Sequence, residues 1–86
     1  MKNLEDLRKE IDEIDRELVS AFQQRMDLQV EIAQLKKRED LPVESKSREE
    51  EILKKWEEKK YFSEIKTLYE TIFTISKDFQ KNKKRD

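Results

Sequence analysis

Hydrophobic side chains recur at alternating intervals of three and four residues along the first part of the chain. The repeat holds Leu, Leu, Ile, Ile, Leu, Ala, Arg, Leu, Ile and Leu at positions 4, 7, 11, 14, 18, 21, 25, 28, 32 and 35. This spacing places the side chains on one face of an α-helix. Because no Pro or Gly interrupts it and Asn3 is a suitable N-cap, the repeat predicts a helix over about residues 4–38, about 50 Å long.

The C-terminal half of this predicted helix carries a second apolar face, where the N-terminal half is polar. The second face consists of Val19, Phe22, Met26, Val30 and Ala33. We therefore expect the C-terminal half to be covered on two sides and the N-terminal half on one. The rest of the chain is too short to cover a rod of about 50 Å as a compact monomer. The pattern predicts a homodimer whose chains pack along their long helices about a two-fold axis.

Two shorter helices are expected after the loop 41–43, where Pro42 disfavours helical backbone at the preceding residue. Ser47 and Glu50 have the spacing of a capping box, which predicts the start of the second helix. Its apolar residues are Ile52, Leu53 and Trp56. The charged stretch 57–60 is expected to end it.

A third helix is predicted over about residues 63–81, followed by a frayed polar tail over residues 81–86. Its apolar positions are Phe62, Ile65, Leu68, Tyr69, Ile72, Phe73, Ile75 and Phe79. We find no internal repeat and no second domain. The chain is therefore predicted to be one all-α domain over residues 1–86, with one long and two shorter helices in an intertwined homodimer.

Composition limits both the fold and the chemistry. With 34% hydrophobic and 48% charged residues, a lone chain of 86 residues would have a thin core, which small domains usually supplement with a disulfide, a metal or oligomerisation. The absence of Cys, His and Gly excludes disulfides, the common zinc sites, histidine bases and glycine-rich phosphate loops. Oligomerisation is the remaining means of stabilisation.

Charge and hydropathy indicate where the protein works. Its 20 basic and 21 acidic residues give a formal net charge of −1, which argues against general affinity for nucleic acids or membranes. No secretory signal is visible, and no apolar run approaches the roughly 20 residues of a membrane span. We expect a cytoplasmic protein with neither nucleic acid nor membrane as a partner.

Arg25 is the one charged residue in the long apolar repeat. No acid lies three or four residues from it, so a pair within the helix cannot neutralise it. Two interpretations stay open. In the first, Arg25 forms a salt bridge with another helix or extends its side chain to solvent. In the second, an anionic ligand completes the site. Lys36 returns to the same face about 16 Å further along, so the two cations can flank a small ligand. Lys36 can equally be solvated or pair with Glu39 or Asp40.

Arg8 also has two interpretations. Glu5 and Asp12 lie within helical pairing distance of it, which favours a surface ion pair. It lies about 25 Å before Arg25, too far to reach the same ligand within one chain. In an antiparallel dimer of long helices, it reaches the partner's site.

Four further polar residues border the apolar faces of the shorter helices. Arg48 and Glu49 precede the apolar face of the second helix by one turn, and surface charges are common there. Ser76 interrupts the apolar face of the third helix, and Gln80 follows one turn later. A buried Ser often bonds the carbonyl four residues back, and Gln80 can be a surface residue at a helix end.

Several segments together carry a family resemblance over nearly the whole chain. They are Leu7-Arg8-Lys9-Glu10-Ile11-Asp12-Glu13-Ile14-Asp15, Gln24-Arg25-Met26, Glu31-Ile32-Ala33-Gln34-Leu35-Lys36, Leu41-Pro42-Val43, Ser47-Arg48-Glu49-Glu50-Glu51, and Ser76 with Gln80. Each motif is weakly specific, but their order and spacing are strongly specific. The chain resembles the all-helical chorismate mutases of the AroQ class, which implies a domain-swapped dimer of three-helix chains with two equivalent sites.

The resemblance implies roles for the residues singled out above. Arg25, and Arg8 from the other chain, are expected to bind two substrate carboxylates, with Ser76 assisting near one of them. Lys36 and Gln80 are expected to contact the ether oxygen of the substrate. Lys36, Gln80 and Arg25 are the predicted catalytic residues.

Three more positions complete the implied site. Glu49 is expected to hold the ring hydroxyl of the substrate, with Arg48 lining the same side. Ser45 stands where the family commonly has an Asp, three residues before the Arg of the second helix. If that Asp acts through its backbone, little is lost; if its side chain matters, hydroxyl binding is weakened.

The function that the resemblance implies is the conversion of chorismate to prephenate in Phe and Tyr biosynthesis. This unimolecular Claisen rearrangement needs no nucleophile, metal or cofactor, so a chain without His and Cys is suited to it. Two alternatives stay open. An isochorismate pyruvate-lyase of the same fold shares the cations, although Glu49 favours the mutase. In a non-catalytic helical dimerisation module, Arg25 pairs with a protein acid instead of a substrate.

Overall fold

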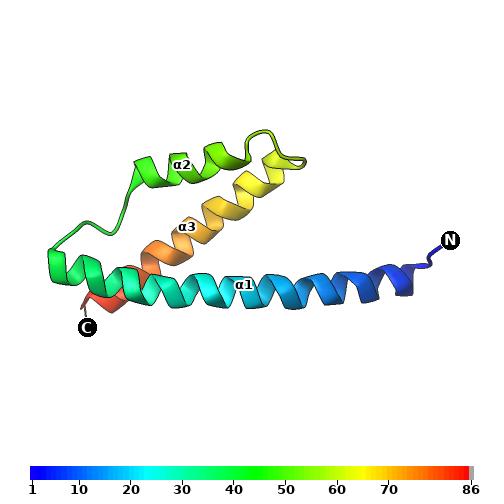
Figure 1. Cartoon of the computed structure of the whole chain (residues 1–86), viewed down its shortest axis with the longest axis horizontal. Coiled ribbons are helices and arrows are strands. Elements are labelled where there is room, and N and C mark those ends of the chain that lie inside the picture. Colours follow the sequence, from blue (N-terminus) through cyan, green and yellow to red (C-terminus); the bar gives the residue numbers. More distant parts are fainter. Residues whose placement is uncertain (86) are drawn as a thin grey trace.

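The computed structural model describes the backbone of residues 1–85 and the side chains of residues 1–82. It contains three α-helices, α1 (Leu4–Glu39), α2 (Lys46–Trp56) and α3 (Phe62–Arg85). The predicted all-α chain with one long helix is thereby confirmed. α1 spans the length of the molecule, and α2 and α3 lie beside its C-terminal part, so that its N-terminal turns project alone (Figure 1).

Capping groups define both ends of α1. The Asn3 side chain accepts a hydrogen bond from the Asp6 amide at 2.9 Å, and the Asp6 side chain accepts one from the Asn3 amide at 3.4 Å. This reciprocal capping box satisfies N–H groups of the first turn and confirms Asn3 as the N-cap. At the other end, Asp40 adopts left-handed backbone, and its N–H bonds to carbonyls of the last turn.

The start of α2 differs from the prediction. The N-cap is Ser45, whose Oγ accepts a hydrogen bond from the Arg48 amide at 3.3 Å. Ser47 lies inside the first turn, so the predicted capping box of Ser47 and Glu50 is wrong. Either serine is a good N-cap. The earlier one serves because the extended backbone of the loop ends there, which adds helical residues to α2.

α3 continues through most of the segment predicted to be a frayed tail. The helix reaches Arg85 instead of ending near residue 81, and Asp86 lies outside the described residues. No Gly or Pro stops the helix.

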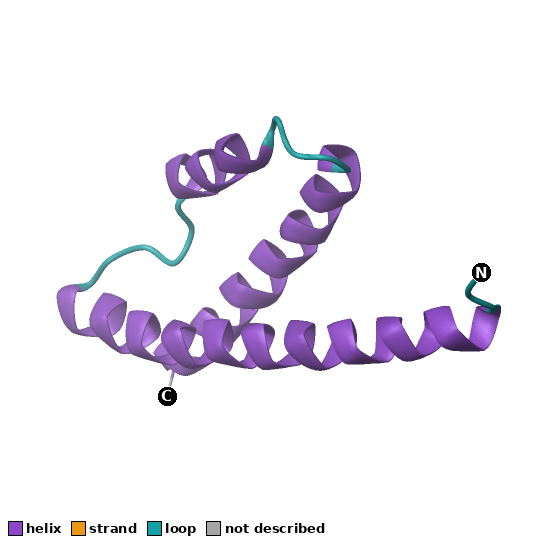
Figure 2. Ribbon diagram, turned by 45° about the vertical axis from the view of Figure 1, so that its right-hand side comes forward, coloured by secondary structure: helices purple, strands orange, loops and turns teal. Residues whose placement is uncertain are grey.

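α1 and α3 run in the same direction, and α2 carries the chain back between them. Two side-chain contacts, Arg25 with Ser76 and Gln29 with Gln80, each join residues 51 positions apart. Because the offset is the same in both contacts, the two helices run parallel to each other where they meet. α3 packs against both other helices, whereas α1 and α2 do not pack on each other within the described residues. Figure 2 shows α2 standing apart from α1, so α3 is the element that holds the chain together.

The core of the single chain is small. Ala33 and Phe73 are the buried apolar residues among those described. An aromatic row attaches α2 to α3: the Trp56 and Tyr69 rings stack with centroids 6.4 Å apart, and Tyr69 and Phe73 lie 5.8 Å apart. Such pairs add to the stabilisation that comes from burial. Apart from Val19, which is 56% exposed, the residues of the second apolar face of α1 are buried or half-buried in the single chain.

The long apolar repeat of α1 remains exposed in the single chain. Leu7, Ile11, Ile14, Leu18 and Leu28 expose between 46% and 58% of their surface. The radius of gyration is 16.4 Å, against about 12 Å for a compact chain of this length. The accessible area is 7368 Å², against about 5,500 Å². Despite this apolar surface, no helix among the described residues combines the length and hydropathy needed to cross a bilayer.

The turn between α2 and α3 contains a strained residue. Tyr61 has φ of 63°, a left-handed conformation that costs a residue with a Cβ about 1–2 kcal/mol. Tyr61 directly precedes α3, and its carbonyl accepts a hydrogen bond from the Ile65 amide at 2.9 Å. Its ring is exposed and lies 5.0 Å from the Lys60 ammonium.

Replacing Tyr61 with Asn, which tolerates left-handed backbone, is expected to raise the free energy of unfolding by about 1 kcal/mol. Urea denaturation followed by circular dichroism at a fixed chain concentration measures this change. Tyr61→Phe, which does not share the tolerance of Asn for left-handed backbone, is expected to unfold at the same urea concentration as the unaltered protein. Earlier unfolding of Tyr61→Asn would mean that the Tyr61 ring stabilises the fold by more than its backbone strain destabilises it.

Candidate active site between the three helices

A pocket of about 470 Å³ opens between the three helices. Its volume is in the range of small-molecule sites. The pocket is lined by Arg25, Leu28, Gln29, Ile32 and Lys36 of α1, Val43 and Ser45 of the following loop, Arg48, Glu49 and Ile52 of α2, and Phe73, Ser76, Lys77 and Gln80 of α3. Seven of the eight predicted site residues, all except Arg8, therefore meet around one cavity.

Two polar contacts join α1 to α3 along the wall of this pocket. The Arg25 guanidinium donates a hydrogen bond to Ser76 Oγ at 2.9 Å, and Gln80 Nε2 donates to Gln29 Oε1. Gln29, Ser76 and Gln80 are all buried. Ser76 accepts a bond from another helix, whereas the Thr74 hydroxyl of the same helix bonds the carbonyl four residues back. These two hydrogen bonds, which join α1 to α3, thus lie at the pocket.

Arg25 has no carboxylate partner among the described residues. Its side chain is half-buried, and its hydrogen-bond acceptor is the neutral hydroxyl of Ser76. The salt bridge from another helix that the sequence left open is therefore absent from this part of the chain. A guanidinium has five N–H donors in a planar fork. Arg25 retains the capacity to bind a carboxylate through two of them.

Lys36 lies at the other end of the pocket wall. Its Nζ donates hydrogen bonds to the Val43 carbonyl at 2.8 Å and to Gln80 Oε1 at 3.0 Å. Because an ammonium can only donate, this contact orients the Gln80 amide with its oxygen toward Lys36 and its NH2 group toward Gln29. The predicted pair of Lys36 and Gln80 is therefore brought together, and Gln29 helps to fix its orientation.

α2 and the loop before it supply the opposite wall. The Ser45 hydroxyl caps α2, as described above. Arg48 lines the pocket but pairs with Glu51 at 2.7 Å, with more than half of each side chain exposed. Exposed pairs of this kind contribute little stability, so Arg48 is readily released to a ligand. The Glu49 side chain is more enclosed, at 24% exposed.

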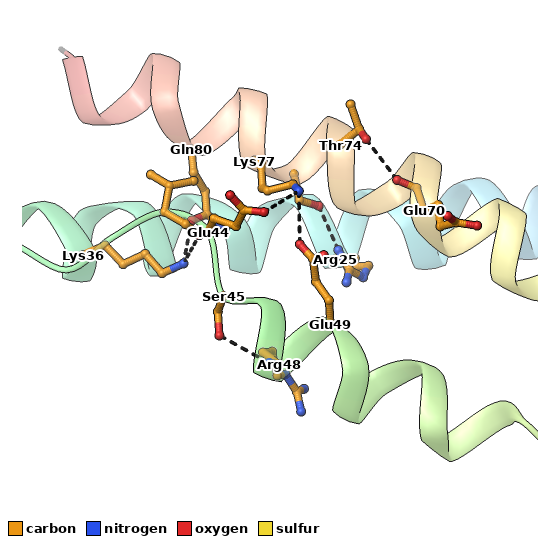
Figure 3. A network of polar contacts seen from close by, with 12 residues as sticks. Arg25, Lys36, Glu44, Ser45, Arg48, Glu49, Glu70, Thr74, Lys77 and Gln80 are labelled. Carbon is orange, nitrogen blue, oxygen red and sulfur yellow. Dashed lines mark hydrogen bonds and ion pairs between the residues drawn. The ribbon is translucent and has the colours of Figure 1, made fainter.

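Lys77 of α3 connects both walls through two acidic residues. Its Nζ lies 3.3 Å from Glu49 Oε2 and 3.5 Å from Glu44 Oε1 (Figure 3). The hydrogen bond to Glu49 is the main reason that the pKa of Lys77 is raised above its ordinary value of 10.5. Lys77 therefore stays protonated throughout the neutral range.

Gln29 and Lys77 are pocket residues that the sequence did not identify. Gln29 follows Arg25 by one helical turn and shares its face, and this spacing is the signal that could have found it. Lys77 is one of many charged residues, which make up 48% of the chain. Nothing in its local sequence distinguishes it from the lysines on the surface.

Arg8 is the predicted site residue that this chain does not bring to its own pocket. It is exposed on the projecting end of α1, about 25 Å before Arg25 along the helix. The described residues include no ion pair between Arg8 and Glu5 or Asp12. The dimer hypothesis places Arg8 at the site of a second chain, and that placement stays a prediction.

These features define a class: a small helical protein whose pocket is lined by several cations and hydrogen-bond donors. The comparison with known proteins is specific. Residues 7–81 match the family described as chorismate mutase type II, and the chain belongs to that family. The resemblance drawn from the sequence is confirmed.

Individual relatives agree with this assignment. The bifunctional chorismate mutase/prephenate dehydratase of Aquifex aeolicus is 40% identical over 55 residues, and the T-protein of Haemophilus influenzae is 41% identical over 49 residues. These matches cover 64% and 57% of this chain, which spans only 15% and 13% of those proteins. The structure of a conserved hypothetical protein from Pyrococcus furiosus superimposes with a TM-score of 0.79 at 36% identity, covering 93% of this chain and 97% of that one.

The raised pKa of Lys77 predicts how its ion pairs depend on pH. A group whose pKa is raised by folding stabilises the fold below its unfolded pKa of 10.5 and loses this effect as pH rises through its folded pKa. We expect Lys77→Met to lower the free energy of unfolding by about 0.5 kcal/mol near neutral pH. The difference from the unaltered protein is expected to vanish in strong alkali.

Urea denaturation of both proteins at neutral and alkaline pH measures this difference. Lys66→Met, which removes an exposed lysine from the same helix, is the matched control and is expected to show no such convergence. A Lys77→Met effect of constant size across the whole pH range would contradict an electrostatic origin.

Proposed function

We propose that this chain is a chorismate mutase, an isomerase that converts chorismate to prephenate in the cytoplasmic synthesis of Phe and Tyr. The observation that carries the proposal is Arg25, half-buried at the pocket beside a neutral hydroxyl and without a carboxylate among the described residues. A dianionic substrate supplies the missing negative charge. Membership of the family supports the same reaction.

Substrate recognition follows from the positions of the cations. Arg25 binds one carboxylate through its planar fork, and Ser76, whose Oγ lies 2.9 Å from the guanidinium, assists it. Arg8 of a second copy of the chain binds the other carboxylate. Holding both carboxylates keeps the flexible side chain of the substrate folded over its ring, in a geometry close to that of the transition state.

The reaction breaks an ether C–O bond and forms a C–C bond within one molecule. No proton, electron or group passes to the protein. Negative charge develops on the ether oxygen, and Lys36 and Gln80 donate hydrogen bonds to it. Gln80 Nε2 has a second hydrogen for this purpose beyond the one that it gives to Gln29. Donors already fixed in position stabilise the transition state more than the ground state.

The wall formed by α2 binds the ring hydroxyl. Glu49 accepts the hydrogen bond from this hydroxyl, and Arg48 lines the same side of the pocket. Ser45 acts indirectly, because its hydroxyl is the N-cap of α2. Since Asp and Ser are comparable N-caps, Ser45 caps α2 here as an Asp at this position would.

Replacing Arg25 or Gln80 with Ala is expected to lower kcat for chorismate by about 100-fold or more, because each change removes a donor aimed at developing or bound charge. Arg25→Lys is also expected to lose most activity, since an ammonium cannot make the forked contact. The measurement is the fall in chorismate absorbance, with prephenate identified as the product.

Arg38→Ala, in the exposed last turn of α1, is the matched control and is expected to retain full activity. Unchanged rates in Arg25→Ala and Gln80→Ala would contradict the assigned site. Release of pyruvate from isochorismate, without prephenate from chorismate, would assign the lyase instead. A folded protein that turns over neither compound and tolerates Arg25→Leu would be the non-catalytic module.

We also propose that the active form is a two-fold homodimer with exchanged long helices. The exposed repeat of α1 and the thin core support it, as does an accessible area about 1,900 Å² above that of a compact monomer. An excess of this size per chain is what permanent dimers bury. Pairing along α1 covers the repeat and brings the projecting Arg8 to the pocket of the other chain.

Mixing inactive chains tests the exchange. Arg8→Ala and Arg25→Ala chains are each expected to be nearly inactive alone. After joint unfolding and refolding, half of the dimers are mixed, and each has one intact site, so about a quarter of the original activity is expected to return. Mixed protein no more active than its components would show that both arginines come from the same chain.

A further inference from the structure

We propose that Lys77 is a positioning residue of this site, which holds the Glu49 carboxylate in place and neutralises its charge beside an anionic substrate. This inference rests on the proposed function. It concerns a residue that neither the periodicity nor the motifs of the sequence singled out.

The two ion pairs of Lys77 differ in length, in exposure and in their position relative to the pocket. Lys77 and Glu49 both line the pocket, and their side chains are 27% and 24% exposed. Glu44 does not line the pocket, and its side chain is 50% exposed. The shorter and more enclosed pair is therefore the one that faces the ligand. A lysine that merely fastened the loop to α3 would need only Glu44.

The contact with Lys77 uses only one of the two carboxylate oxygens of Glu49. Lys77 contacts Glu49 Oε2, and Glu49 Oε1 has no partner among the described residues. Oε1 is thus available to accept a hydrogen bond from the substrate hydroxyl. A carboxylate held through one oxygen has fewer orientations to lose when the substrate binds, which reduces the entropy cost of binding.

Charge gives a second reason for this lysine. A substrate with two carboxylates is repelled by the ionised Glu49 that must contact its hydroxyl, and the repulsion grows as water leaves the site. Lys77 Nζ lies 3.3 Å from Glu49 Oε2, so its charge offsets that of the carboxylate that lines the pocket, whereas the more exposed Glu44 is screened by solvent. The raised pKa of Lys77 keeps the compensating charge in place at neutral pH.

Steady-state kinetics of Lys77→Gln and Lys77→Arg test the role. Lys77→Gln is expected to lower kcat/KM for chorismate about 10-fold, the usual effect of losing one charge-assisted hydrogen bond. The loss is expected to fall on KM more than on kcat, because the hydroxyl itself takes no part in the bonds that break and form. Lys77→Arg restores the charge and is expected to recover most of the loss. Lys66→Gln, on the same helix outside the pocket, is the control.

A double-mutant cycle distinguishes positioning from general stabilisation. If Lys77 acts through Glu49, Lys77→Gln adds little to the loss in kcat/KM already caused by Glu49→Gln. Independent, multiplying losses would overturn the proposal, as would an unchanged KM in Lys77→Gln or no recovery in Lys77→Arg. Circular dichroism and solution size establish that the variants compared are folded alike.

Failure of this inference is distinguishable from failure of the proposed function. Chorismate turnover by the unaltered protein together with normal kinetics in Lys77→Gln would overturn only the role of Lys77. No turnover by the unaltered protein would overturn the proposed function, and the role of Lys77 with it.

Discussion

The hydrogen bond between Arg25 and Ser76 joins a half-buried cation to a neutral oxygen, and the rest of the molecule is arranged around it. A carboxylate in place of that hydroxyl would hold α1 and α3 together more strongly but would neutralise the charge that a ligand needs. Gln29, Ser76 and Gln80 are buried along these two helices, together with the apolar Ala33 and Phe73. Three of the five buried residues in the described part of the chain are thus polar.

That arrangement explains why the single chain has so little internal packing. When polar groups occupy the seam between α1 and α3, hydrophobic burial must come from elsewhere, and the long repeat of α1 is the largest apolar surface available. The polar residues at the pocket are thus one physical reason for the proposed dimer, which would bury the apolar repeat of α1.

Periodicity predicted the existence and order of the helices because long repeats without Gly or Pro leave few other structures. It failed at the start of α2, where Ser45 and Ser47 are chemically equivalent caps and the path of the loop chooses between them. Arg25 was found because a charge in an apolar row is conspicuous. Gln29 and Lys77 were missed because their partners lie on other helices, and Gln80 is 51 positions from Gln29.

The constant spacing of 51 positions between α1 and α3 has a consequence for how such a chain tolerates insertions and deletions. Residues gained or lost in the loop after α1 or in the turn before α3 change that spacing without disturbing the match between the helices. One residue inserted between Arg25 and Gln29 would instead rotate everything beyond it by about 100° and separate the two contacts. Relatives of different length are therefore expected to differ in the connections, while both helices keep their register.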